Sequence, residues 1–175
     1  MNAYPWYELI EDSDEIAQGD ILFHCPVAVL SDYCDENSEI NSEIHDIDGI
    51  IMTQACDIAN RKVENIILCA ITSVGDYSKG RSNKEVRKSL DSIKKGQQNA
   101  LHILNHYHEG DFQQDYYIVN FKDIFSIPIV LARKVAEKNG KRLRLLPPYR
   151  EHLSQAFARY FMRVGLPVDI DFEEE

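Results

Sequence analysis

The segment from Glu64 to Thr72 constrains the fold more than any other part of the chain, because its apolar side chains face both ways. A strand with that pattern is covered on both faces, so we expect it near the centre of a sheet. Gly49 to Gln54 is a second strong strand. Another apolar run follows Gly19 and Asp20, and Pro26 either divides it into two short strands or places it at a sheet edge.

Two helices have clear sequence signals. Ser82 and Glu85 form a capping box, in which each side chain satisfies a backbone amide of the first helical turn. That helix should end by Gly96. Tyr149 to Val164 carries an apolar stripe of helical period and should form a C-terminal helix. A shorter helix is expected over residues 129–137.

The remaining elements read as strands. Ala100–His108 and Tyr116–Val119 flank a turn at Gly110-Asp111, which favours a hairpin. Arg142 to Leu145 alternates basic and apolar side chains and predicts a further strand. The sequence therefore indicates an α+β fold: a small, mostly antiparallel barrel or curled sheet with a mid-chain helix and a C-terminal helix.

Charge is distributed unevenly along the chain. The first 60 residues contain 14 Asp and Glu but no Lys or Arg, whereas residues 61–168 contain all 19 Lys and Arg against 10 acids. Two acidic segments stand out: an excursion over residues 31–46, expected to be a loop or a loose hairpin, and a tail over residues 169–175. The acidic part can cover the basic part, bind a basic partner, or simply stay solvated. The length predicts a single domain over residues 1–175.

Targeting and cofactor motifs are absent from the sequence. The chain has no run of 18 apolar residues and begins without a basic, apolar leader, so we expect a cytoplasmic protein with no membrane segment. Its four cysteines should then be reduced, and their spacing matches no common zinc pattern. Cys69 reads as a core residue. The sequence contains no P-loop and no GxGxxG, HExxH or GxSxG motif, and we expect no cofactor and no metal.

Two short motifs resemble the MazF/PemK group of toxins. Gly19-Asp20-Ile21 opens a strand near the N-terminus, and Ile71-Thr72-Ser73 ends the central apolar strand, with Gly49 to Gln54 between them. The resemblance covers roughly residues 19–75. It implies an SH3-like antiparallel barrel of five or more strands, with a terminal helix packed against it.

The resemblance also implies a catalytic site. Typical members are ribonucleases that cut single-stranded RNA by attack of a 2′-hydroxyl on the neighbouring phosphate, helped by an arginine and by a Ser or Thr. The hydroxyl residue corresponds to Thr72 or Ser73. Where the family has Arg-Pro this chain has Asp48-Gly49, and an aspartate repels the negative charge that develops on the phosphate. Arg61 or Arg142 would have to supply the missing positive charge.

Thr53 to Asp57 is the most unusual polar cluster, and it follows a strand directly. Gln54 and Asp57 can bond backbone amides and cap the following turn, which is the reading we favour. Alternatively, Gln54, Cys56 and Asp57 contact a ligand or a partner at a strand end, where sites are common. Nucleophilic use of Cys56 is the least favoured, because the charge of Asp57 opposes a thiolate.

A basic patch is formed by Arg142 and Arg144, with Tyr149 and Arg150 nearby. A nucleobase could stack on Tyr149 while the arginines hold phosphates. We favour instead pairing of the arginines with the acidic first part of the chain or with a protein partner. A merely solvated basic face is the remaining alternative.

Three histidines, His102, His106 and His108, lie beside Glu109 and Asp111. In a helix the first two would share a face at a spacing known from metal sites, and in a strand all three would line one face. Because no further ligand is defined by the spacing, we favour ordinary exposed side chains over a metal site.

These features favour a protein that acts by binding. The leading hypothesis is a non-catalytic regulatory subunit of MazF-like fold in a prokaryotic toxin–antitoxin or defence-type system, a context that comes only from the resemblance. Its expected partner is a protein, with RNA binding and a homodimer left open. The alternative is an active, metal-independent endoribonuclease that uses Thr72, Ser73 and Arg61. A weaker alternative is a small-ligand or metal-binding module.

Overall fold

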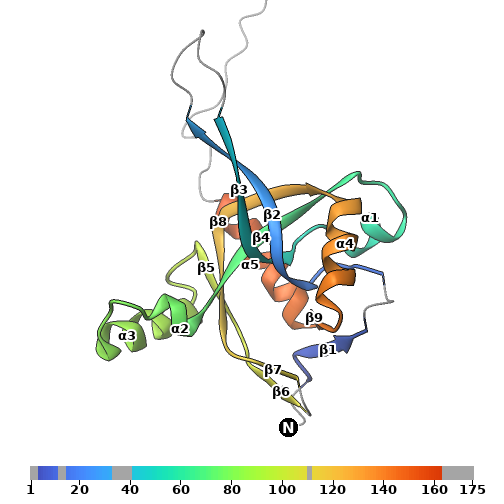
Figure 1. Ribbon diagram of the computed structural model, residues 1–175. Coiled ribbons are helices and arrows are strands. Elements are labelled where there is room, and N and C mark those ends of the chain that lie inside the picture. The colour runs from blue at the N-terminus through green and yellow to red at the C-terminus, as the bar shows by residue number, and fades with distance from the viewer. Residues whose placement is uncertain (1–3, 12–14, 33–40, 110–111, 163–175) are drawn as a thin grey trace, which may run out of the picture.

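The computed structural model describes residues 4–11, 15–32, 41–109 and 112–162, and it shows an α+β protein built on a five-stranded antiparallel sheet (Figure 1). The strands lie in the order β2-β3-β4-β8-β5. Their bounds are β2 (Ile21–Asp32), β3 (Asn41–Ile51), β4 (Asn65–Ser73), β8 (Tyr117–Pro128) and β5 (Leu101–Leu104). The prediction of an α+β fold with a mostly antiparallel sheet is confirmed, and the apolar strand β4 is the central one.

Both faces of β4 are covered, as its sequence predicts. Ile66 and Leu68 pack in one cluster with the apolar side of α4 (Ile129–Asn139). Cys69 and Ile71 point to the opposite face and belong to a second cluster, which includes the helix α5 (Tyr149–Phe161). Because successive side chains of a strand alternate between faces, one strand contributes to two cores.

Two small ribbons complete the sheet structure. β1 (Tyr7–Ile10) pairs with β9 (Arg142–Leu145), and β6 (Tyr107–Glu109) pairs with β7 (Phe112–Gln114). The predicted pairing of the segments before and after Gly110-Asp111 is confirmed, since β5 pairs with β8 and β6 pairs with β7, while the turn residues themselves lie outside the described residues. The strand β9 has the predicted bounds, whereas the sequence did not indicate β1.

The helices agree with the sequence signals where those signals are strong. α3 (Asn83–Lys94) begins with the predicted capping box, and α5 begins at Tyr149. α4 also matches its prediction within two residues. The last part of the predicted C-terminal helix lies outside the described residues. The sequence did not indicate the short helices α1 (Ala55–Ala59) and α2 (Val74–Tyr77).

The described part of the sheet does not close into a barrel, contrary to our expectation. Closure requires the two edge strands to pair. The edge strand β5 is only four residues long and pairs with β8 alone. At the other edge, Asp20, the residue before β2, forms an isolated bridge with Arg144 of β9, and β2 packs against α4.

The two described ends of the acidic excursion belong to strands. β2 runs to Asp32 and β3 begins at Asn41, and this hairpin projects beyond the rest of the molecule at the top of Figure 1. Residues 33–40 and the acidic tail 169–175 lie outside the described residues. Pro26 lies in the edge strand and does not divide it, so the second of the two alternatives for this proline is correct.

A bulge bends β2 between Leu22 and Cys25, where His24 has a φ of 56°. The Asn139 side chain at the end of α4 stabilises this bend, because it accepts a hydrogen bond from the Phe23 amide at 2.8 Å and donates one to the Phe23 carbonyl at 3.0 Å. No helix among the described residues is long and apolar enough to cross a membrane.

Candidate ligand-binding groove

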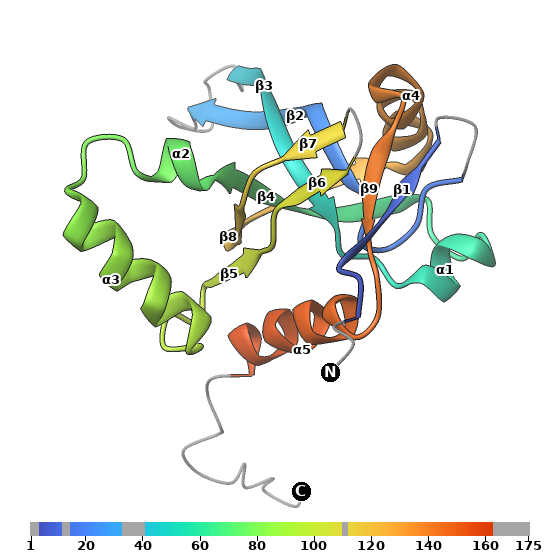
Figure 2. The ribbon, with the colours of Figure 1, turned by 90° about the horizontal axis from the view of Figure 1, so that it is seen from below.

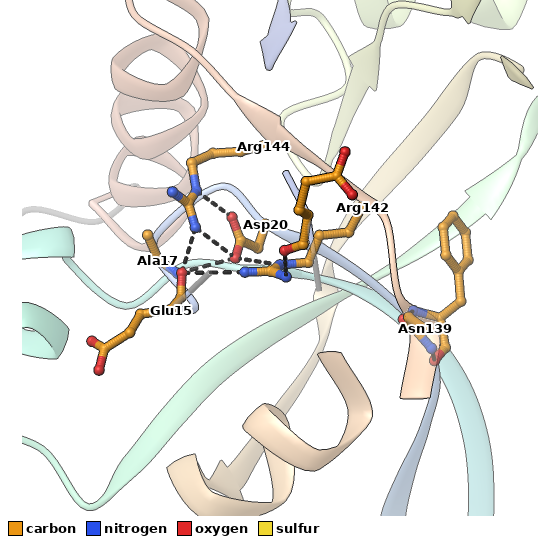
Figure 3. Close-up of polar contacts among 8 residues, drawn as sticks. Glu15, Ala17, Asp20, Asn139, Arg142 and Arg144 are labelled. Carbon is orange, nitrogen blue, oxygen red and sulfur yellow. Dashed lines mark hydrogen bonds and ion pairs between the residues drawn. The ribbon is translucent and has the colours of Figure 1, made fainter. Parts of the chain in front are cut away.

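Arg142 and Arg144, the centre of the predicted basic patch, converge on one carboxylate (Figure 3). Arg142 Nε donates to Asp20 Oδ2 at 2.8 Å, and Arg144 donates to both oxygens of Asp20. The same carboxylate accepts the Ala17 amide, and both guanidinium groups also donate to the Glu15 carbonyl. The side chains of Arg142 and Asp20 are fully buried.

This cluster ties the acidic front of the chain to the basic strand β9. Fully buried charges persist only when they are paired and hydrogen-bonded, which is the case here. Arg142 and Arg144 are therefore paired within the chain, with a residue of its acidic first part. Neither side chain extends freely into solvent. Arg150 lies elsewhere, at the start of α5, where it pairs with Glu151.

The residues of the ribonuclease alternative lie apart. Arg61 follows α1, before the start of β4, whereas Thr72 and Ser73 end β4. Nine residues of strand span about 26 Å, so β4 separates the arginine from the two hydroxyl groups. Ser73 is also occupied, because its hydroxyl caps α2 by accepting the Asp76 amide and donating to the Asp76 carboxylate.

The Thr53–Asp57 cluster forms the corner between β3 and α1. Gln54 precedes α1 but makes no capping hydrogen bond with its side chain, and the Asp57 carboxylate accepts from no backbone amide of the described residues, so the favoured capping role is wrong for both. Thr53 is the residue that bonds a backbone amide, since its hydroxyl accepts from Ile67 at 2.7 Å. The side chain of Cys56 is exposed, and its Sγ lies 3.8 Å from the Asp57 carboxylate.

The three histidines do not form one cluster: two of them pair with each other, and the third pairs with His152. The rings of His106 and His108 lie 4.9 Å apart, whereas His102 lies 5.2 Å from His152 of α5. Loss of contact with water, followed by the neighbouring His152, lowers the pKa of His102 to about 4. Within the described ranges, no group of three His, Cys, Asp or Glu side chains is arranged to hold a metal ion.

His102 and His152 belong to a groove of about 500 Å³ between the end of α3, β5 and α5. These elements are neighbours in Figure 2. One wall carries Trp6 and Tyr149, whose rings are stacked with centroids 3.8 Å apart and planes 11° from parallel. The predicted contact residue Tyr149 is thus combined with an aromatic partner and two imidazoles.

The charge of the groove is positive. Its charged lining consists of Lys94, Lys95 and Arg159, and no Asp or Glu is among its described lining residues. Neither lysine forms an ion pair with any residue that the structure describes. Lys95 also borders a neighbouring hollow of about 730 Å³ along α3, whose charged lining is completed by Lys84, Arg87 and Lys88 and by one carboxylate, that of Asp91. The groove is therefore one end of a basic track along α3.

The sequence indicated Tyr149 and His102 as candidate residues, but it did not indicate Trp6, His152 and Arg159 as members of the same site. His152, Ala156 and Arg159 recur at helical spacing, which was a usable signal for a common face of α5. Nothing in the sequence indicated that this face meets the end of α3 and the N-terminal Trp6.

No protein-family model matches the chain, and no curated protein matches its sequence.

Proposed function

We propose that this protein acts by binding single-stranded RNA in the groove between α3, β5 and α5, without cleaving it. The main support is the composition of the groove, in which stacked aromatic rings adjoin three cations, with no carboxylate among the lining residues that the structure describes. Single strands bind proteins through these two kinds of contact: bases stack on aromatic side chains, and cations hold the phosphates. The basic track along α3 extends the same surface beyond one nucleotide.

The separation of Arg61 from Thr72 and Ser73 favours binding over catalysis. Stabilisation of a phosphate transition state requires a cation within contact distance of the developing charge. Arg142, the other candidate for that role, is buried against Asp20. Metal-independent cleavage of RNA by the Thr72 corner remains the alternative function, and the experiment below separates the two.

We assign the protein, also as a proposal, to a MazF-like variant of the small antiparallel fold and to a regulatory role in a toxin–antitoxin or defence-type system. Two positions support the fold: Gly19-Asp20-Ile21 lies at the start of β2, and Ile71-Thr72-Ser73 ends β4. A helix, α5, packs against the sheet. The biological context follows from the resemblance alone.

A second candidate function is docking of a basic protein partner on the hairpin formed by β2 and β3. Leu30 and Ile44 are each 70% exposed there, and the β2–β3 pairing places them on the same face of the hairpin. Asp46 lies two residues beyond Ile44 on the same face of the hairpin. Exposed apolar side chains with one sign of charge around them suit a partner segment that carries apolar and basic residues.

RNA binding can be measured through Trp6, because it is the only tryptophan of the chain and lies in the groove. We expect a 12-nucleotide single-stranded RNA to change its fluorescence, with affinity that falls as salt rises. For single strands each phosphate contact contributes about 0.7 to the slope of log K against log salt. Combined Lys95→Ala and Arg159→Ala substitutions remove two such contacts, so the magnitude of the slope should decrease by about 1.4.

The matched control is the pair Lys134→Ala and Lys138→Ala, which removes two exposed cations from α4 on the other face of the sheet and should leave the slope unchanged. The same RNA, incubated without metal, should stay intact. Cleavage that disappears in Thr72→Ala would establish the ribonuclease alternative, and a flat salt dependence would contradict the binding proposal.

A further inference from the structure

A second cavity lies on the other side of α5 from the groove. It has a volume of about 400 Å³ and is bounded by the β3–α1 corner, the start of β4 and α5. His152, Ala156 and Arg159 of α5 face the groove, whereas Ser154, Phe157 and Ala158 line the second cavity. The two sites are therefore separated by about the width of one helix, roughly 10 Å.

Hydrogen bonds within the protein shape one wall of this cavity. The nearly buried Gln18 donates to the Met52 carbonyl at 3.2 Å and to Ser154 Oγ at 3.0 Å, which joins the end of β3 to α5. The Thr53 hydroxyl accepts a hydrogen bond from the Ile67 amide. Two polar lining side chains, Gln54 and Asn65, make no side-chain hydrogen bond to another described residue, and Asp57 has only the weak contact with Cys56.

The chemistry of this cavity differs from that of the groove. Its charged lining is the single carboxylate of Asp57, and none of its described lining residues is a cation. A phosphate is therefore disfavoured, and a group that donates N–H bonds is favoured. Met52, Ile67 and Phe157 supply an apolar surface for a planar ring, while the two amides offer both donors and acceptors.

We propose that this cavity binds a nucleobase that carries an exocyclic amino group. The base belongs to an RNA strand whose neighbouring nucleotides occupy the groove. The Asp57 carboxylate accepts a hydrogen bond from the amino group, and the amide of Gln54 forms hydrogen bonds with the adjacent edge of the ring. Carboxylates accept in this way from the N4 amino group of cytosine. The inference rests on the proposed function, and it makes the Thr53–Asp57 corner the part of the protein that selects the base.

A comparison of cytosine with uracil tests this inference separately from general RNA binding. At position 4 cytosine carries an amino group, whereas uracil carries a carbonyl. We expect the protein to bind a 12-nucleotide oligocytidylate more tightly than the oligouridylate at pH 7.5, by roughly 5- to 100-fold. Asp57→Asn and Gln54→Ala should each reduce this ratio several-fold. Neither change should alter the salt dependence, because no phosphate contact is lost.

Glu64→Gln is the matched control, because it removes an exposed carboxylate next to the cavity without removing a lining residue. It should leave the ratio unchanged. Equal affinities for the two oligomers, or a ratio that Asp57→Asn leaves intact, would overturn the inference while the RNA-binding proposal stands. Failure of both oligomers to bind in the Trp6 assay would overturn the proposed function itself.

Discussion

At the scale of single residues, the Gly19-Asp20-Ile21 motif has a structural role at each position. Gly19 has a φ of +88°, and a Cβ there would lie 3.0 Å from the Leu145 carbonyl oxygen. Asp20 accepts from two arginines, and Ile21 is fully buried in the core. The three residues join the start of β2 to β9, so the motif is explained by packing and charge without any reference to catalysis.

Asp20→Asn should destabilise the protein by about 3–5 kcal/mol, because it leaves the buried guanidinium of Arg142 without a charged partner. Chemical denaturation monitored by circular dichroism measures the free energy of unfolding. Lys141→Ala is the control, since it breaks the exposed Lys141–Glu11 pair and should cost less than about 1 kcal/mol. Equal losses in the two variants would show that the buried cluster contributes little.

At the scale of elements, α5 organises the candidate sites. Leu153 is buried under the sheet, while the two flanks of the helix line the groove and the second cavity. An apolar stripe on one side of a helix leaves both flanks available for polar contacts. A single helix can therefore place the two proposed surfaces, one for phosphates and one for a base, next to each other.

The β2–β3 hairpin is the second element with a testable role. Leu30→Ser combined with Ile44→Ser should abolish recovery of a basic protein partner when the tagged protein is purified from its own cells, as measured by mass spectrometry. Because both side chains are exposed, the free energy of unfolding should change by no more than about 0.5 kcal/mol. Val130→Ser alters an apolar residue on α4 that is 61% exposed and serves as control. Recovery of the same partner with the hairpin variant would contradict the docking proposal.

At the scale of the whole molecule, the segregated charge of the chain is only partly neutralised by internal pairing. The acidic front meets the basic part at Asp20 and at the exposed pairs Lys141–Glu11 and Arg133–Glu15. The helix α3 and the β2–β3 hairpin lie at separate places in Figure 1. The molecule therefore presents two charged surfaces, which suit two different partners.

The stability of the molecule should depend on pH through His102, where β5 packs against α5. Its pKa in the folded protein is lowered to about 4 from an ordinary 6.5, mainly by burial. The unfolded chain therefore binds more protons between these values, so stability is complete above about pH 6.5 and falls as the pH drops toward 4. The loss amounts to up to about 3 kcal/mol.

His102→Gln removes this titration, so its free energy of unfolding should vary less with pH than that of the unaltered protein. Denaturation curves at several values between pH 4 and pH 7 measure the difference. His45→Gln changes an exposed histidine and should follow the unaltered protein. Identical pH dependence of all three proteins would rule out His102 as the cause.

Local signals predicted much of the fold. The two-sided apolar pattern of Glu64–Thr72 placed β4 at the centre of the sheet, and the capping box placed the start of α3. The alternation of Arg142–Leu145 predicted β9 with its observed bounds. These properties depend on the periodicity of neighbouring side chains and on bonds within one turn, so a single sequence contains them.

The tertiary structure decided which residues share a site. The sequence could not distinguish a ligand-binding Arg142 from one buried against Asp20, because the two residues are 122 positions apart. Nor could it show that Trp6, His102 and Arg159 border one groove, or that β5 is too short to close a barrel. Contacts of this kind form between elements distant along the chain, and they are determined by how whole faces pack against each other, which the periodicity of a single segment does not record.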